Sequence, residues 1–238
     1  MCLEKMISKD MKIFNLFPLT VLQNKIILED NERNILIKEI KKMRDEQIEE
    51  KKSNYAWTGD TKGHEFLFSN TTFKNISHKI SEVIKEYLKA LSINIEMLDI
   101  YYQRSWATYT ENEQSINFHT HSQSNISFAY YLLKPPGAGG IIFRSNELQN
   151  EIAKNIFTSS KIEKSLINKP NPYNSDRSMF DLDQDSIIIF PSKTPHATMP
   201  NKSGKLRVSI SGDVTIMLKE SKGFEHLMPS FNNWTKFN

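Results

Sequence analysis

The sequence predicts an α+β protein in which N-terminal helices pack on a jelly-roll core. Residues 1–94 contain two segments with apolar residues at helical spacing, whereas residues 95–218 contain short segments in which polar and apolar residues alternate. The chain has 238 residues, of which 38% are hydrophobic, and this is enough apolar material for one large core. We therefore expect a single domain over residues 1–238, with residues 219–238 as a C-terminal tail.

Two amphipathic helices are expected in the first third of the chain. The first follows Glu29-Asp30-Asn31, whose side chains can cap a helix, and it continues into a charged tail near Glu49 and Lys52. The second follows Asn75, and its apolar residues share one face: Ile76, Ile80, Val83, Ile84, Tyr87, Leu88 and Leu91. Because each helix has one apolar side, we expect both to pack against a sheet. The loop between them, residues 55–64, is polar and carries two glycines.

Strands are expected from about residue 95 onward. The alternating segments lie near residues 97–109, 115–121, 126–133, 140–144, 186–190, 195–199 and 205–217. Residues 146–185 interrupt this rhythm with a partly helical pattern from Ile152 to Ile167, followed by Pro170 and Pro172. We interpret this segment as an excursion at the mouth of the barrel.

Composition excludes several classes of function. Lys and Arg number 31 against 28 Asp and Glu, and no basic face of the kind that binds nucleic acid is evident. Cys2 is the only cysteine, which excludes an intrachain disulfide and a cysteine-based zinc site and favours a reducing, cytoplasmic location. Charged residues interrupt the apolar positions from Met1 to Leu28, so we expect no signal peptide. No segment has the ~20 apolar residues of a membrane span.

Three of the six histidines form a pattern that suits a metal ion. On an extended segment, His119 and His121 point to the same side, because side chains alternate along a strand. His196 follows the apolar strand that ends at Phe190, and in a barrel this strand can lie beside the first pair. Neutral imidazole binds iron, zinc, copper and nickel, and three ligands leave positions open on the ion. The alternative is a chance pair of surface histidines.

A basic residue follows the third histidine. Arg207 alternates with apolar neighbours together with Ser209 and Ser211, so one face of this segment is polar. If that face points into the barrel, the guanidinium needs an anionic partner, and a ligand carboxylate would supply one with Ser209 adding a hydrogen bond. The alternative is that Arg207 and Ser209 face solvent on an edge strand.

Taken together, these segments resemble the iron(II)- and 2-oxoglutarate-dependent oxygenases of the double-stranded β-helix fold. The resemblance is closest to the prolyl-hydroxylase-like branch, and within it to a 2OG-Fe(II) oxygenase family of bacteria and phages. It is carried by His119-Thr120-His121 with residues 126–132, by residues 135–143, and by residues 190–209. The Trp57-Thr58-Gly59-Asp60 loop and Trp234 are also similar to that family.

The resemblance implies roles for individual residues. His119 matches the proximal iron ligand and His196 the distal one, while Arg207 with Ser209 matches the pair that holds the distal carboxylate of 2-oxoglutarate. Tyr131 matches a strand tyrosine that binds the same carboxylate, whereas its neighbour Tyr130 would point into the core. The implied activity is hydroxylation of an unidentified small-molecule or peptidyl substrate, with dioxygen consumed and succinate and CO2 released. Some relatives pair through helical or strand edges, which leaves a homodimer open.

One position departs from the pattern of that superfamily. Most members carry Asp or Glu two residues after the first histidine, whereas this chain has His121, which we take as the third metal ligand. Two other outcomes stay open: a carboxylate such as Glu147, Asp181 or Asp183 completes the site, or the site prefers another metal. The missing carboxylate also favours a non-catalytic barrel that retains a vestigial site.

Two other functions and the substrate pocket remain open. A cupin-like metal enzyme without 2-oxoglutarate would share the barrel and the paired histidines, and a non-catalytic jelly-roll protein would bind a small carboxylate or a partner. Arg207 discriminates between the cupin-like enzyme and the oxygenase, because a cupin-like enzyme has no anionic cosubstrate for Arg207 to bind. Trp106 and Tyr109 are candidates for the pocket wall, but their odd spacing allows only one of them to face it.

Overall fold

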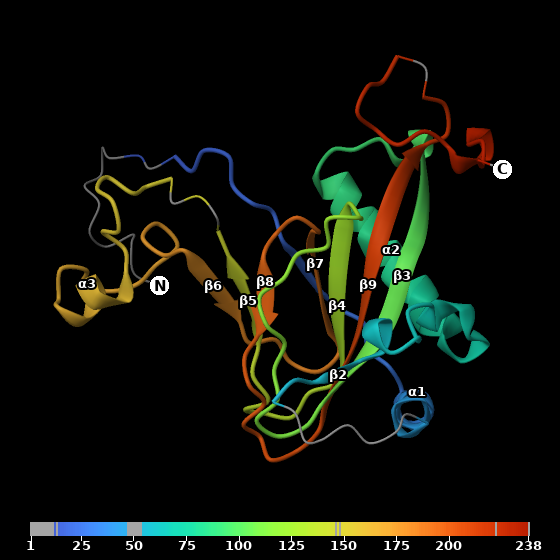
Figure 1. The fold of residues 1–238 in the computed structure, drawn as a ribbon, viewed down its shortest axis with the longest axis horizontal. Helices are drawn as coiled ribbons and strands as arrows, with labels where there is room; N and C mark the ends of the chain where they lie inside the picture. Colours follow the sequence, from blue (N-terminus) through green and yellow to red (C-terminus); the bar gives the residue numbers. More distant parts are fainter. Residues whose placement is uncertain are drawn as a thin grey trace.

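Two antiparallel sheets form the centre of this computed structural model, which describes residues 12, 14–46, 54–145, 147, 149–221 and 223–237 (Figure 1). The larger sheet has the strand order β1-β7-β4-β9-β3-β2, and the smaller has the order β6-β5-β8. The strands are β1 (Leu22–Lys25), β2 (Trp57–Thr58), β3 (Leu98–Thr110), β4 (Ile126–Leu133), β5 (Ile141–Arg144), β6 (Arg177–Phe180), β7 (Ser186–Pro191), β8 (His196–Thr198) and β9 (Arg207–Leu218). Helices and antiparallel sheets together confirm the predicted α+β class.

Two helices cover the outer face of the larger sheet. They are α1 (Asp30–Asp45) and α2 (Lys74–Ala90), and Figure 1 shows them on the side away from the smaller sheet. The apolar face predicted for α2 is buried: Ile76 and Ile80 are 0% exposed and pack with Tyr130, Val208 and Ile210 of the sheet. Their burial follows from the spacing of three and four, which places the apolar residues on one side of the helix.

The inner face of the larger sheet is polar along β9. Across β9 and its neighbours, Ser209 pairs with Thr108 on one side and with Tyr131 on the other. Residues two apart along β9 share this face, so Arg207, Ser209 and Asp213 point away from the helices and toward the smaller sheet. The space between the two sheets is therefore lined by polar side chains from β9 and by apolar side chains from β7, among them Ile188 and Phe190.

Several expected elements differ from the structure. Residues 115–121 do not form a regular strand, because only isolated bridges connect Ser115 to Tyr55 and His119 to His196. Asn75 lies inside α2, which begins one residue earlier and follows the short 3₁₀ turn Thr71–Phe73. No side-chain hydrogen bond caps α1, whose N-cap is Glu29. The charged tail expected near Glu49 and Lys52 lies outside the described residues.

The interruption between β5 and β7 also differs from the expectation. Its only described helix is the short α3 (Ser159–Glu163), far less than the partly helical pattern suggested. Its last part forms β6, which pairs with β5 and completes the smaller sheet. Figure 1 shows α3 extending away from the sheets. The excursion therefore ends before Arg177, where β6 begins to pair with β5.

Within the described residues, every helix is too short or too polar to cross a membrane.

Candidate functional site

Three histidines from two distant segments lie together at one end of the space between the sheets. His119 and His121 precede β4, and His196 begins β8. Their ring centres are separated by 4.9 Å for His119 and His121, 4.3 Å for His119 and His196, and 5.2 Å for His121 and His196. One imidazole nitrogen from each lies within 4.8 Å of the other two. In the described part of the chain, no other group of His, Cys, Asp or Glu has this convergent spacing.

Backbone hydrogen bonds hold the three residues in place. His119 and His196 exchange both of their backbone N–H···O bonds, each 3.0 Å long. The backbone N–H of His121 donates to the carbonyl of Ser192 at 3.1 Å. The short extended segment therefore orients its two histidines without being part of a continuous sheet.

The hydrogen bonds of the rings fix which nitrogen is free. Nδ1 of His119 lies 2.8 Å from the carbonyl of Asn117, and Nδ1 of His196 lies 2.9 Å from the carbonyl of Thr194. Nδ1 of His121 lies 3.2 Å from Oδ2 of Asp213. Because a carbonyl or an ionised carboxylate can only accept, each Nδ1 carries the hydrogen and each Nε2 keeps its lone pair. Each of the three rings therefore keeps one nitrogen, Nε2, free to bind a metal ion.

Burial keeps two of the three rings, those of His119 and His196, neutral. It lowers the pKa of His196 to about 3, helped by the neighbouring His119, and it lowers the pKa of His119. At neutral pH both rings are therefore uncharged, which is the form of imidazole that coordinates a metal.

Aromatic rings form the wall beside the histidines. The Trp106 ring stacks on His121 with 5.5 Å between centres, and the Phe190 ring meets His196 edge-on at 4.7 Å. Tyr109, the other candidate for this wall, lies on the opposite face of β3, where the guanidinium of Arg44 is 5.1 Å from its ring centre. Of the two aromatic residues that the sequence offered, only Trp106 reaches the site.

Asp213 is a site residue that the sequence analysis missed. It is 0% exposed and accepts hydrogen bonds from His121, from Gln123 at 2.9 Å and from Ser127 at 3.0 Å. Burial alone would raise the pKa of its carboxyl, but the hydrogen bonds from His121 and Ser127 hold that pKa below its usual value. The available signal was its position in the polar alternation that begins at Arg207.

The alternative carboxylates lie elsewhere. Asp181 forms an ion pair with Lys134 at 2.7 Å, and Asp183 is 3.6 Å from Lys25 with a side chain that is 90% exposed. The exposed Glu147 is held by Ser145 through its backbone. None of these three joins the histidine group.

Arg207 is buried rather than exposed on an edge. It is 2% exposed and donates from Nη1 to the carbonyls of Ala138, at 2.6 Å, and Met199, at 3.2 Å. Nη2 donates to Oγ1 of Thr198 at 3.1 Å. The loop that carries Ala138 turns at Gly139, whose φ of +75° favours glycine and whose Cβ position lies 2.8 Å from the carbonyl oxygen of Pro200.

Arg207 differs from the other buried cations in its charge partners. The described residues include three buried Lys or Arg side chains. Arg33 pairs with Asp185 at 2.7 Å, and Lys134 pairs with Asp181. Every described hydrogen bond of Arg207 is with a neutral oxygen, and no described carboxylate lies within ion-pair distance of it. Its charge is therefore uncompensated by a described acid.

Tyr131 and Ser209 share the inner face with Arg207. Tyr131 is 2% exposed, and burial raises the pKa of its hydroxyl to about 12, so the hydroxyl stays protonated and can donate. Ser209 is half-buried and lies opposite Tyr131 across β4 and β9. Tyr130 points to the other face as expected, where its hydroxyl lies 2.9 Å from the carbonyl of Ile26.

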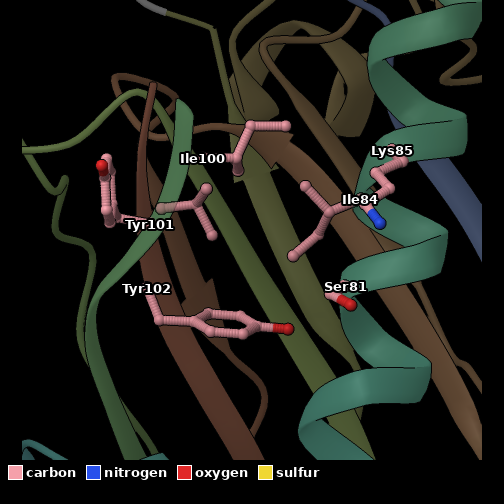
Figure 2. Close-up of a pocket in the computed structure, with 7 residues that line it drawn as sticks. Ser81, Ile84, Lys85, Ile100, Tyr101 and Tyr102 are labelled. Atoms are coloured by element: carbon pink, nitrogen blue, oxygen red, sulfur yellow. The ribbon is translucent and has the colours of Figure 1, made fainter. Parts of the chain in front are cut away.

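A hollow lies on the opposite face of the larger sheet. Figure 2 shows it between α2 and β3, with Ile84 and Lys85 on the helix and Tyr102 reaching toward the helix from the strand. Val214, which also lines it, points to the helical side of β9, away from the histidines. This hollow is therefore separate from the candidate site.

One family model matches the part of the chain that contains the candidate site. The family model described as "putative 2OG-Fe(II) oxygenase" matches residues 104–213, a range that includes the three histidines and Arg207. No curated protein sequence matches the chain.

Solved structures with a similar fold have low sequence identity. The α-ketoglutarate-dependent carbocyclase SnoK from nogalamycin biosynthesis has 10% identity and a TM-score of 0.53, with 82% of this chain and 79% of SnoK covered. HygX from Streptomyces hygroscopicus, solved with nickel and 2-oxoglutarate, has 8% identity and a TM-score of 0.52, with 83% of each chain covered. AviO1 from Streptomyces viridochromogenes Tue57 has 11% identity and a TM-score of 0.51, with 83% of this chain and 90% of AviO1 covered.

The family match and the shared fold agree with the resemblance found in the sequence. Identities of 8–11% show only that the core is of the same jelly-roll type. The family model adds the sequence pattern of residues 104–213. The chain is therefore similar to the 2OG-Fe(II) oxygenases in the sequence pattern of residues 104–213 and in its fold.

Proposed function

We propose that His119, His121 and His196 hold the iron(II), and that Arg207, Ser209 and Tyr131 bind the distal carboxylate of 2-oxoglutarate. When bound, iron(II) with 2-oxoglutarate and dioxygen supplies the oxidising chemistry that hydroxylates a C–H bond and releases succinate and CO2. The chain itself supplies the metal ligands, orients the cosubstrate and excludes water from the reacting groups. The substrate is a small molecule or a peptidyl side chain.

The observation that carries this proposal is the charge of Arg207, which no acid among the described residues compensates. An unpaired buried charge costs several kcal/mol, so a buried guanidinium without an acid favours an anionic ligand. A guanidinium has five N–H donors, and the three described hydrogen bonds leave two for a carboxylate. The protonated hydroxyl of Tyr131 and the hydroxyl of Ser209 lie on the same face and can donate to the same anion.

The tautomers of the histidines support the metal assignment. In each ring, Nδ1–H donates a hydrogen bond to an acceptor within the protein, and Nε2 stays free. Metal-binding histidines are commonly held in this way. Three nitrogen ligands leave positions on the ion for the cosubstrate and dioxygen. The rings of Trp106 and Phe190 exclude water from one side of this group.

Arg207 and the histidines together weigh against the two alternatives. A cupin-like enzyme without 2-oxoglutarate would use the histidines but would leave the buried guanidinium without an anionic cosubstrate. A small-carboxylate binding protein would use Arg207 but would have no need for three rings with matched tautomers.

An anaerobic titration tests the proposal. Purified protein is titrated with iron(II) and 2-oxoglutarate while the visible charge-transfer band of the complex is recorded, and succinate is assayed after oxygen is admitted. The native protein should develop the band, whereas His196→Ala should not bind iron. Arg207→Met should bind iron but lose the band at 2-oxoglutarate concentrations that saturate the native protein.

Controls separate loss of binding from loss of structure. Arg207→Lys keeps the charge and should retain part of the 2-oxoglutarate affinity. Arg44→Met removes a half-exposed arginine that pairs with Glu111 on another surface, and it should leave the titration unchanged. Metal binding without a 2-oxoglutarate band would favour the cupin-like enzyme, and a native protein that binds no metal would favour the non-catalytic barrel.

The cellular setting and assembly extend this proposal. The single cysteine is consistent with a reducing cytoplasm. We keep the homodimer as a prediction, and sedimentation of the purified chain at several concentrations tests it. The single-domain organisation over residues 1–238 likewise stays a prediction.

A further inference from the structure

We infer that Asp213 is a positioning residue for the metal centre, which supplies through His121 the negative charge that a carboxylate ligand supplies in most related sites. This inference rests on the proposed function, because it needs the three histidines to hold a metal ion. It assigns a role to a residue 92 positions away from its partner in the sequence.

The contacts of Asp213 point at His121. Oδ2 of Asp213 lies 3.2 Å from Nδ1 of His121 and also accepts from Gln123 at 2.9 Å. Oδ1 accepts from Ser127 at 3.0 Å. Both oxygens are therefore fixed by donors, and the carboxylate cannot rotate without breaking several hydrogen bonds.

His121 is held between two groups. Trp106 stacks on one face of its ring, and Asp213 binds its Nδ1–H edge. With Nδ1 protonated toward the carboxylate, the lone pair of Nε2 points to the other two histidines. A carboxylate on Nδ1–H also makes Nε2 more basic and so a better ligand.

Asp213 differs from the acceptors of the other two rings. Nδ1 of His119 and Nδ1 of His196 donate to backbone carbonyls, which carry no charge. Among the described residues, Asp213 is the acid that hydrogen-bonds to the histidine group. Three neutral imidazoles on a divalent ion leave two positive charges, and Asp213 reduces the local total to one. That total equals the charge of a site with two histidines and one carboxylate ligand.

Burying the carboxylate of Asp213 costs free energy unless a cation lies nearby. A carboxylate that is 0% exposed loses its hydration, and replacing buried ionic groups by apolar ones often stabilises a protein. The described residues offer Asp213 no Lys or Arg within ion-pair distance. A divalent cation one residue away would compensate this charge.

Asp213→Asn tests the charge with little change in shape. The amide oxygen can still accept from His121 and Gln123 while its nitrogen faces Ser127, so the variant keeps a hydrogen bond and loses the negative charge. If the amide turns the other way, Nδ1 of His121 must accept, and its hydrogen moves to Nε2, where it blocks the metal. Both orientations should weaken metal binding.

Two measurements read the effect without the enzyme reaction. Cobalt(II) titration followed by its visible absorption should give a dissociation constant raised about 10–100-fold in Asp213→Asn. Nitrogen NMR of ¹⁵N-histidine-labelled, metal-free protein should show the Nδ1–H tautomer for His121 in the native chain and a loss of that preference in the variant. If the variant does not fold, the NMR spectrum of the native protein still tests the inference, because it reports the tautomer of His121.

Asp185→Asn is the matched control. Asp185 is also a buried carboxylate, but it binds Arg33 and Tyr130 on the helical side of the sheet. This variant should lower the melting temperature and leave cobalt affinity unchanged within threefold.

The outcomes separate this inference from the proposed function. If Asp213→Asn binds cobalt as tightly as the native protein does, Asp213 has no role in the metal site. The same conclusion follows if His121 of the native protein carries the Nε2–H tautomer. Both results leave the assignment of the metal site unchanged. Native protein that binds no cobalt overturns both the role of Asp213 and the proposed metal site.

Discussion

Arg104 and Asp60 connect a loop to the wall of the histidine site. Nη2 of Arg104 lies 3.1 Å from Oδ2 of Asp60, and the same guanidinium lies 5.3 Å from the ring centre of Trp106. Trp106 in turn stacks on His121. A continuous set of contacts therefore runs from the Trp57–Asp60 loop, whose role the sequence left open, to a proposed metal ligand.

Asp60→Asn should loosen this loop without removing the metal site. The ion pair is partly buried, with side chains 29% and 16% exposed, so its loss should cost about 1 kcal/mol of unfolding free energy. Hydrogen exchange of residues 57–64 should become faster, while cobalt affinity stays within threefold of the native value. Glu111→Gln, which breaks the more exposed pair with Arg44, is the control and should not change exchange in that loop. Unchanged exchange in Asp60→Asn would show that the ion pair does not hold the loop.

The metal-free protein should lose stability as the pH falls from 7 to 5. The imidazole of His196 has a pKa of about 3 in the folded chain, against ~6.5 when unfolded. Between these values the unfolded chain binds a proton that the native chain does not, so stability rises with pH and decreases on acidification. His196 alone should contribute about 2 kcal/mol to the difference between pH 7 and pH 5. His119, whose pKa is also lowered, acts in the same direction.

Urea unfolding in EDTA at the two pH values measures this effect. His196→Asn has no imidazole to titrate and should show a smaller loss of stability between pH 7 and pH 5. Equal losses in the native and variant proteins would show that His196 titrates normally in the folded state.

The neighbourhood of Asp213 explains why position 121 holds a histidine. In His121→Asp, one carboxylate oxygen would occupy the position of Nδ1, since both atoms are bonded to Cγ, and it would lie about 3.2 Å from Oδ2 of Asp213. Two buried carboxylates at this distance raise the pKa of one of them. A raised folded-state pKa gives stability at low pH that is lost as pH rises, opposite to the native behaviour. His121→Asp should therefore be less stable than the native protein at pH 7 and should regain stability toward pH 5.

Adding Asp213→Asn to His121→Asp should relieve the repulsion. The double variant should be more stable at pH 7 than His121→Asp alone and should lose the inverted pH dependence in urea unfolding. If the single variant is as stable as the native chain at pH 7, the two carboxylates do not approach each other.

Local patterns in the sequence predicted the elements that have one apolar face. The spacing of Ile76, Ile80 and Ile84 defined the buried side of α2, because helix periodicity alone places these residues together. The alternation at His119 and His121 predicted a shared direction, and this direction holds although the segment makes only isolated bridges. Leu91 follows the same spacing but is 40% exposed, since the helix ends at Ala90.

Features that depend on pairing between distant segments could not be predicted in the same way. β6 has a burial pattern with three exposed residues of four, so it lacks the apolar alternation that marks a strand. The contact between His121 and Asp213 requires the register of β9 against β4, which no local pattern specifies. The contrast between Arg207 and the paired cations Arg33 and Lys134 likewise requires the positions of their acids.

Two adjacent tyrosines provide a matched pair of variants for the 2-oxoglutarate proposal. Tyr130 and Tyr131 follow each other on β4 and point to opposite faces. The hydroxyl of Tyr130 lies 2.9 Å from the carbonyl of Ile26 and 2.8 Å from Oδ1 of Asp185, among residues that pack with the helices. The hydroxyl of Tyr131 belongs to the polar inner face with Arg207 and Ser209. Removing one oxygen atom from each residue therefore changes two different environments.

Tyr131→Phe should weaken binding of 2-oxoglutarate, and Tyr130→Phe should weaken the fold. Loss of one hydrogen bond to the cosubstrate carboxylate, which is charged, corresponds to about 1.5–3 kcal/mol, or roughly a 10–150-fold higher dissociation constant. Tyr130→Phe should cost about 1–2 kcal/mol of unfolding free energy, because Asp185 and the carbonyl of Ile26 lose a buried donor. Calorimetric titration of the manganese(II)-loaded protein with 2-oxoglutarate and urea unfolding measure the two effects. Equal 2-oxoglutarate affinities in the two variants would remove Tyr131 from the proposed cosubstrate site.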